Sequence, residues 1–282
     1  MSRLDQLRVG LAQLTSSDRY SDNITCLERS AAAAESTGCD LLALPEVAGI
    51  MPAQKFDLSE ITDGDDPFVN AARECATRRG IWIHIGSTLV RSGDRLRNHS
   101  LLIDRNGRIH ARYDKLHLFD VHLEGGKPFR ESDRYQPGSE AVAVHTPWGL
   151  CGMSICYDLR FPQLYRDYGQ IGARVIFVPS AFTVPTGNAH WQPLLQTRAI
   201  ENGCWIVAAA QVGIHPAGRR TYGHSMIVSP WGRVVVDLGG DGTGFAATTL
   251  DLGLVQSARR QLASLSHDRD YRMRIEDTER HT

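Results

Sequence analysis

The sequence predicts an α/β protein in which two sheets pack together and helices cover their outer faces. Three observations favour this fold class. Short apolar runs typical of buried strands alternate with segments of helical periodicity, turn signals join neighbouring strands as hairpins, and no low-complexity linker divides the chain. The 282 residues, 42% of them hydrophobic, suffice for one large domain or two small ones, and we favour one.

The first half of the chain has the pattern of a βαβαβ unit followed by hairpins. Polar capping residues mark the starts of its helices, glycines mark their ends, and glycine-containing turns mark the hairpins. We expect, in order, a strand at 7–14, a helix from Asn23 to about Gly38, a strand at 41–44 that ends on Pro45-Glu46, a helix from Asp66-Pro67 to Gly80, a strand at 81–89, and hairpin turns at Ser92-Gly93-Asp94 and Asn106-Gly107.

The second half repeats strands around two further helices. Before it, the segment 114–140 has no steady periodicity, and so long a loop in a compact domain is usually functional or disordered. The turn 146–149, Thr-Pro-Trp-Gly, recurs in similar form at 229–232, which suggests two similar halves. We expect strands at 141–145, 150–155, 175–178 and 205–210, helices opening near Gln163 and covering about 190–202, and closing strands around Met226, Val235 and Ala247.

Charge and hydropathy restrict the partners. Lys and Arg total 31 against 32 for Asp and Glu, so the net charge of −1 provides no field that attracts nucleic acid or an anionic membrane. No window approaches the roughly 18 apolar residues of a spanning helix, and Met1–Asp5 leads directly into a strand. We therefore expect a soluble, cytoplasmic protein. Its six scattered cysteines indicate reduced thiols rather than a disulfide framework.

Three reactive side chains stand at the ends of expected strands, where α/β proteins collect their chemistry. Cys156 follows an apolar strand, although a cysteine taken alone is more often an inert core residue. A Glu46 carboxyl that turns inward beside the thiol would have its pKa raised by desolvation and would serve as a proton shuttle. A buried Lys115 would favour the thiolate and, with the backbone N–H of Tyr157, bind an oxyanion.

Three blocks of sequence resemble the nitrilase, or carbon–nitrogen hydrolase, superfamily. They are Ala43-Leu44-Pro45-Glu46, the segment 113–120 (YDKLHLFD) and the segment 152–162 (GMSICYDLRFP), and they follow one another in the superfamily's order. The chain is also similar to the Nit branch, which includes ω-amidase and deaminated-glutathione amidase, through the segments 179–183 (PSAFT), 186–191 (TGNAHW), 198–202 (RAIEN) and 222–226 (YGHSM).

The resemblance implies a catalytic triad of Glu46, Lys115 and Cys156, with Glu131 as a second active-site glutamate that orients the lysine. It also implies a four-layer αββα sandwich of two mixed sheets with helices outside, assembled as a homodimer or a higher homo-oligomer, without a metal or organic cofactor. On this basis residues 1–256 form one carbon–nitrogen hydrolase domain. Residues 257–282, rich in Arg, Asp and Glu, are expected to form a C-terminal tail that packs on a neighbouring subunit or frays.

The expected reaction is the hydrolysis of a small carboxylate-bearing amide through a thioester on Cys156. Nitriles and N-carbamoyl amino acids remain alternatives within the superfamily, because they share the same attack geometry. Arg198 and Glu201 have helical spacing and are expected to form a structural ion pair. The substrate-binding candidates are Arg160, which suits a substrate carboxylate or an internal ion pair equally, and Phe182, Thr183 and Thr186, which follow a strand end.

Other function classes remain open at this stage. In the Nit branch glutamates commonly stand where this chain has Gln163 and Gln192, so a catalytically weakened metabolite-binding protein is one alternative. A papain-like enzyme would pair Cys156 with a histidine from among His117, His122, His190 and His224. A metal site would draw on His117, Asp120 and His122, whose mixed short spacing is a weak signal.

Overall fold

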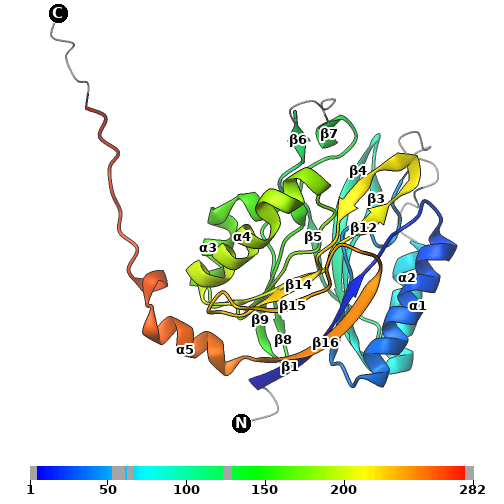
Figure 1. Cartoon of the computed structure of the whole chain (residues 1–282), viewed down its shortest axis with the longest axis horizontal. Coiled ribbons are helices and arrows are strands. Elements are labelled where there is room, and N and C mark those ends of the chain that lie inside the picture. Colours follow the sequence, from blue (N-terminus) through cyan, green and yellow to red (C-terminus); the bar gives the residue numbers. More distant parts are fainter. Residues whose placement is uncertain (1–4, 53–60, 62–65, 123–128, 277–282) are drawn as a thin grey trace, which may run out of the picture.

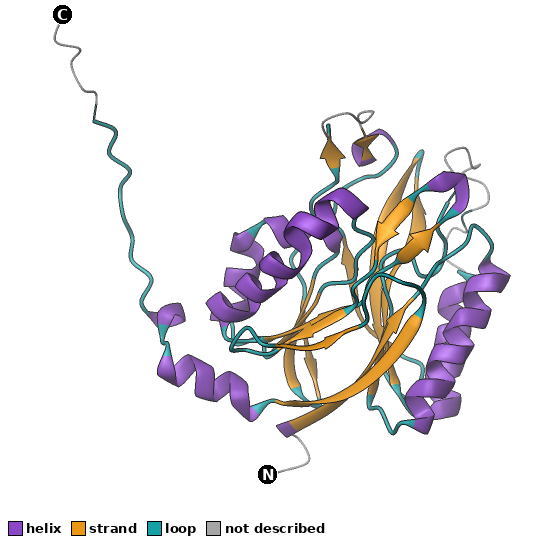
Figure 2. Cartoon of the chain, in the orientation of Figure 1, coloured by secondary structure: helices purple, strands orange, loops and turns teal. Residues whose placement is uncertain are grey.

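The computed structural model describes residues 5–52, 61, 66–122 and 129–276. Two six-stranded sheets lie face to face in this part of the chain (Figures 1 and 2). Helices α1 (Tyr20–Ser36) and α2 (Pro67–Arg79) cover the outer face of one sheet, and α3 (Pro162–Gln170) and α4 (Val184–Asn202) cover the other (Figure 1). The predicted α/β fold, a sandwich of two mixed sheets with helices outside, is confirmed.

The first sheet contains the strands of the N-terminal half and one returning strand. Three neighbouring strands in it are parallel, because helices α1 and α2 form the crossovers between them, and the remaining pairings are antiparallel. The strand order is β16 (Gly244–Asp251), β1 (Gln6–Gln13), β2 (Leu41–Ala43), β3 (Trp82–Ser92), β4 (Arg95–Ile103) and β5 (Ile109–Asp114).

The second sheet repeats this topology, as the recurring turn sequence suggested. Its three parallel strands are again flanked by antiparallel pairs. The order is β15 (Val234–Asp237), β14 (Met226–Val228), β11 (Trp205–Ala208), β10 (Val175–Phe177), β9 (Gly149–Met153) and β8 (Ala143–Thr146), and two small ribbons stand apart, β12 (Val212–Ile214) with β13 (Arg220–Tyr222) and β6 (Asp120–Val121) with β7 (Phe129–Arg130).

The alternation of side chains along β1 shows how the layers are held together. Val9 and Leu11 are fully buried in a cluster that joins the two sheets, whereas Ala12 and Leu14 belong to a second cluster beneath α1 and α2. Successive residues of one strand thus serve two different apolar layers. Burying both faces explains why the strands read as continuous apolar runs rather than alternating ones.

Two expected helix starts were wrong. Helix α1 begins at Tyr20, three residues before the expected cap, because the Asn23 amide bonds elsewhere: it accepts from the N–H of Ser17 and donates to the carbonyls of Ser17 and Gly49. Helix α4 begins at Val184 instead of near 190. A proline in its first turn suits that position, because its fixed φ is already helical and it lacks an N–H that would have no partner there.

The C-terminal region adds a helix that the sequence pattern did not predict. Helix α5 (Gly253–Gln261) crosses the expected boundary at 256/257, and the chain then extends away from the sandwich to residue 276 (Figure 1). The packing of 257–282 on a neighbouring subunit stays a prediction. Among the described helices, none has the length and apolar character needed to cross a bilayer. All six cysteines are free, as expected.

Candidate active site

Glu46, Lys115 and Cys156 follow the ends of β2, β5 and β9, and the three side chains line one cavity. The cavity holds about 540 Å³ of empty space, counting the part open to solvent. Residues far apart in the sequence therefore meet at one edge of the two packed sheets. The walls of the cavity are formed by Glu46, Val47, Asn98, Lys115, Phe119, Phe129, Glu131, Tyr135, Cys156, Tyr157, Ala181, Phe182, Thr183, Thr186 and Arg219.

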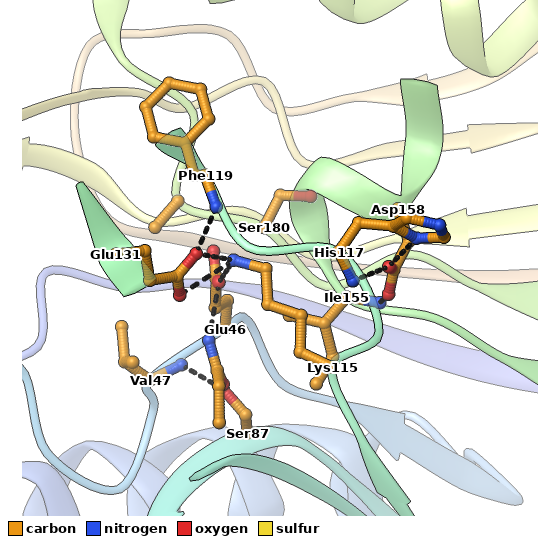
Figure 3. Close-up of polar contacts among 12 residues, drawn as sticks. Glu46, Val47, Ser87, Lys115, His117, Phe119, Glu131, Ile155, Asp158 and Ser180 are labelled. Carbon is orange, nitrogen blue, oxygen red and sulfur yellow. Dashed lines mark hydrogen bonds and ion pairs between the residues drawn. The ribbon is translucent and has the colours of Figure 1, made fainter. Parts of the chain in front are cut away.

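Lys115 is enclosed by two carboxylates (Figure 3). Its Nζ lies 3.0 Å from Glu46 Oε1 and 3.0 and 2.9 Å from the two oxygens of Glu131, and the side chain is 2% exposed. Burial alone would lower the pKa of Lys115, but the charges of Glu131 and Glu46 outweigh it and raise that pKa well above its ordinary value. The lysine is therefore a fixed cation inside the cavity.

Glu46 has one oxygen engaged and one free. Its Oε1 accepts from Lys115 and, at 2.8 Å, from Asn98 Nδ2, whereas its buried Oε2 has no hydrogen-bond partner in the described part of the chain. Burial alone would raise the pKa of Glu46, but the charges of Lys115 and Arg219 outweigh it and hold the pKa below the ordinary 4.5. The expected shift toward neutrality was therefore wrong, because two cations offset the desolvation.

Cys156 sits on a strained turn that holds its sulfur in the cavity. Its φ of 52° lies in the left-handed region that favours glycine, and its N–H donates to the carbonyl of Pro179 at 2.9 Å. Burial, together with the negative charge of Glu46, raises the pKa of the thiol, and Lys115 opposes this only in part. The resting pair is therefore a protonated thiol beside an ionised carboxylate, rather than a preformed thiolate.

Asp158 joins the lysine-bearing segment to the cysteine-bearing turn, a role the sequence analysis did not assign. Its carboxylate is fully buried and accepts from Tyr113 Oη at 2.6 Å and from the N–H of Ile155 at 2.8 Å. Its other oxygen accepts from the His117 N–H at 3.0 Å and lies 2.7 Å from His117 Nδ1 (Figure 3). These bonds fix both segments relative to each other. Its position two residues after Cys156 was the only available signal.

The predicted substrate-binding residues divide into two groups. Phe182, Thr183 and Thr186 line the cavity, as does Tyr157, the predicted backbone donor to the oxyanion. Arg160 does not: its guanidinium lies 5.8 and 5.6 Å from the ring centres of Tyr157 and Phe182 and within 3.3 Å of a histidine. Its role as a carboxylate ligand stays a prediction. The predicted structural pair, Arg198 with Glu201, is confirmed at 2.9 Å.

Two polar residues of the cavity were missed by the sequence analysis. Asn98 reaches Glu46 from β4, and Arg219 enters the cavity wall from the connection between β12 and β13. Neither lies beside a reactive residue in the sequence. The fold alone brings them to the site.

The geometry disfavours the other enzyme classes. The four histidines considered as partners of Cys156 are absent from the cavity walls, and His117 and His224 instead bond to Asp158 and Asp237. Within the described ranges, no group of three His, Cys, Asp or Glu side chains is arranged to hold a metal ion. Gln163 and Gln192 are both exposed and lie outside the cavity, so neither takes a charge away from it.

Comparisons with known proteins agree with this geometry. A family model described as carbon–nitrogen hydrolase matches residues 8–260. The chain belongs to the carbon–nitrogen hydrolase family. It is 41% identical over 267 residues to a deaminated glutathione amidase of Yersinia enterocolitica, an alignment that covers 93% of this chain and 92% of that protein.

Solved structures place this carbon–nitrogen hydrolase in the Nit branch of the nitrilase superfamily. The NitFhit protein of Caenorhabditis elegans superimposes with a TM-score of 0.87 at 36% identity, covering 94% of this chain and 65% of that one. Nit3 of Saccharomyces cerevisiae, a member of branch 10 of the superfamily, superimposes with a TM-score of 0.78 at 26% identity, covering 93% and 96%. The reaction class of this carbon–nitrogen hydrolase is the hydrolysis of C–N bonds, and its homologues are named amidases.

Proposed function

We propose that this chain is an amidase that hydrolyses a small carboxylate-bearing amide, with Cys156 as nucleophile, Glu46 as general base and acid, and Glu131 as the residue that positions Lys115. One observation carries the proposal. A buried lysine bridges two carboxylates in the cavity that also holds a strained cysteine. Four titratable groups arranged in this way suit nucleophilic acyl transfer.

The first half of the reaction forms a thioester. The Cys156 sulfur attacks the carbonyl carbon of the amide while its proton passes to the free oxygen of Glu46. The carbonyl oxygen becomes negative and is stabilised by Lys115 Nζ and the backbone N–H of Tyr157. When this intermediate collapses, the C–N bond breaks and Glu46 returns the proton to the departing nitrogen. The amine, or ammonia, leaves.

The second half hydrolyses the thioester. Glu46, again ionised, accepts a proton from a water molecule, and the resulting hydroxide attacks the same carbon. The oxyanion forms at the same two donors, the C–S bond breaks, and the thiolate regains its proton from Glu46. The products are a carboxylic acid and the original enzyme. Because the resting pKa values favour protonated sulfur and ionised carboxylate, the first half begins from the protonation state that it needs.

The similar proteins narrow the substrate class. A relative at 41% identity over most of both chains is named deaminated glutathione amidase, and so are further relatives at 37–41% identity. We therefore propose that the amide carries a carboxylate on its acyl side. The aromatic walls and the two cations of the cavity are compatible with such a molecule.

A substrate panel tests this function. Purified protein is incubated with deaminated glutathione, α-keto acid ω-amides, N-carbamoyl amino acids and aliphatic nitriles, and released amine or ammonia is measured. We expect turnover of the carboxylate-bearing amides, an acyl adduct on Cys156 by mass spectrometry, and no turnover by Cys156→Ala. Turnover of nitriles alone would contradict the amide assignment. If no compound gave turnover or an adduct, the proposal that the protein is an enzyme would be contradicted.

We also propose that the protein is a cytoplasmic homo-oligomer in which residues 257–282 contact a neighbouring subunit. The extended segment carries Tyr271, Met273 and Ile275, which are 82%, 79% and 85% exposed, and single exposed chains rarely leave such apolar residues unpacked. We expect sedimentation to give a multimer for the full chain and a lower mass for a chain ending at residue 266. An unchanged mass after truncation would show that the tail does not support assembly.

A further inference from the structure

The cavity contains two cations, and they differ in how they are paired. Lys115 is occupied by Glu46 and Glu131. Arg219 forms no ion pair in the part of the chain that the structure describes: its Nη2 donates to the Ala181 carbonyl at 3.1 Å, and its Nη1 lies 3.9 Å from a thioether sulfur, which is a weak acceptor. A guanidinium carries five N–H donors in a planar fork, so Arg219 keeps donors for a ligand.

Arg219 shares its cavity with the nucleophile, Cys156. Arg219, Ala181 and Cys156 all line the same cavity, and the carbonyl of Ala181 accepts from Arg219 Nη2 at 3.1 Å. A short acyl chain attacked by Cys156 at one end is therefore able to reach the guanidinium with its other end.

The loop that carries Arg219 is fixed to the cavity wall. Thr221 pairs with Thr183 as an isolated antiparallel bridge, and the N–H of Tyr222 donates to the carbonyl of Phe182 at 3.0 Å. These contacts lie two and three residues after Arg219. The guanidinium is thus presented by a braced segment, which reduces the entropy lost when it binds a ligand.

The charge balance of the cavity requires a second cation for an anionic substrate. The two negative charges of Glu46 and Glu131 exceed the single positive charge of Lys115 by one. Arg219 balances this remaining negative charge, and its own positive charge contributes to the lowered pKa of Glu46. Without Arg219, a substrate carboxylate would enter a site with excess negative charge and be repelled. With it, the carboxylate meets a planar donor suited to bidentate bonding.

We propose that Arg219 binds the carboxylate of the acyl chain and is the residue that determines the preference for carboxylate-bearing over neutral amides. This inference rests on the proposed amidase function and assigns its specificity to one residue. Arg219 takes the role that the sequence analysis gave to Arg160, because Arg219 lies on the cavity wall and Arg160 lies outside it.

Paired substrates and paired arginines test this assignment. Glutaramate is compared with pentanamide, its neutral counterpart, for the wild type, Arg219→Gln, Arg219→Lys and Arg220→Gln, the last being an exposed arginine at the adjacent position. Losing a charge-assisted bond is expected to reduce kcat/KM for glutaramate about 10- to 100-fold in Arg219→Gln, mainly through KM. Pentanamide turnover should fall by a smaller factor, because that substrate loses only the effect of Arg219 on Glu46. Arg219→Lys should recover part of the loss, and Arg220→Gln should resemble the wild type.

Each other outcome overturns the assignment. Equal losses with both substrates would mean that Arg219 acts through Glu46 or the fold, and a loss selective for glutaramate in Arg160→Gln but not in Arg219→Gln would move the role to Arg160. If the wild type hydrolyses neither amide, the proposed function fails. Calorimetric measurement of glutarate binding then still tests whether Arg219 binds a carboxylate. The Cys156→Ala variant should bind glutarate, and the Cys156→Ala/Arg219→Gln variant should not. Equal binding by the two variants would refute the role of Arg219.

Discussion

Replacing Glu46 by Gln is expected to lower kcat/KM by about 10³-fold, within the range usual for loss of a general base. The amide keeps an oxygen for Asn98 and Lys115 but has no basic oxygen to accept the thiol proton, and in the wild type that acceptor is the unpartnered Oε2. Ammonia release measures the loss, and mass spectrometry should show that the acyl adduct on Cys156 accumulates more slowly. Glu140→Gln, which alters an exposed carboxylate, serves as the control and should retain full activity.

The pH profile gives an independent readout of the same residue. The reaction needs Glu46 ionised, and its pKa lies below 4.5, so activity is present above that value and is lost as the pH falls through the lowered pKa. We expect the kcat/KM of the wild type to stay level from neutral pH down to about 4.5 and to decline only below it. A Glu46→Gln variant that retains more than a tenth of the wild-type kcat/KM would instead favour a cysteine–histidine mechanism.

Replacing Lys115 by Met is expected to cost both stability and activity. The change leaves Glu46 and Glu131 buried without their shared cation, and removal of one member of a buried ion pair typically lowers the free energy of unfolding by about 3–5 kcal/mol. It also removes an oxyanion donor, which typically lowers kcat by about 10²- to 10³-fold. Urea unfolding and ammonia release measure the two effects on the same preparation.

A double variant separates these two roles of Lys115. Lys115→Met/Glu131→Gln removes one buried negative charge together with the positive one, so part of the lost stability should return. Activity should not return, because the oxyanion still lacks its cation. Recovery of activity along with stability would show that Lys115 serves only as a counterion to the carboxylates.

The strand ends explain why the central residues of the site were predictable. Cys156 follows an apolar run and precedes a proline-marked turn, and Pro45-Glu46 ends another apolar run. Because parallel strands present their carboxyl ends at one edge, local sequence indicated both a position and a chemistry. Lys115 also stands at the end of an expected strand, whereas only the resemblance distinguished Glu131 from an ordinary surface charge.

Helix boundaries were less predictable because tertiary contacts override local signals. Asn23 has the composition of a cap, yet its amide bonds to Ser17 and Gly49, and the helix starts three residues earlier. Helix α5 has no capping hydrogen bond from a side chain at its start. The contact of Asn23 with Gly49 comes from a segment that a local window does not contain.

The sequence by itself determined the α/β class, the strand and turn order, and the reactive residues at strand ends, because these depend on periodicity, turn chemistry and residue type. Only the tertiary structure decided the charge state of the site and the residues Asn98, Asp158 and Arg219 that surround it. A pKa is set by the balance of burial against neighbouring charges, and that balance exists only after distant segments have packed together.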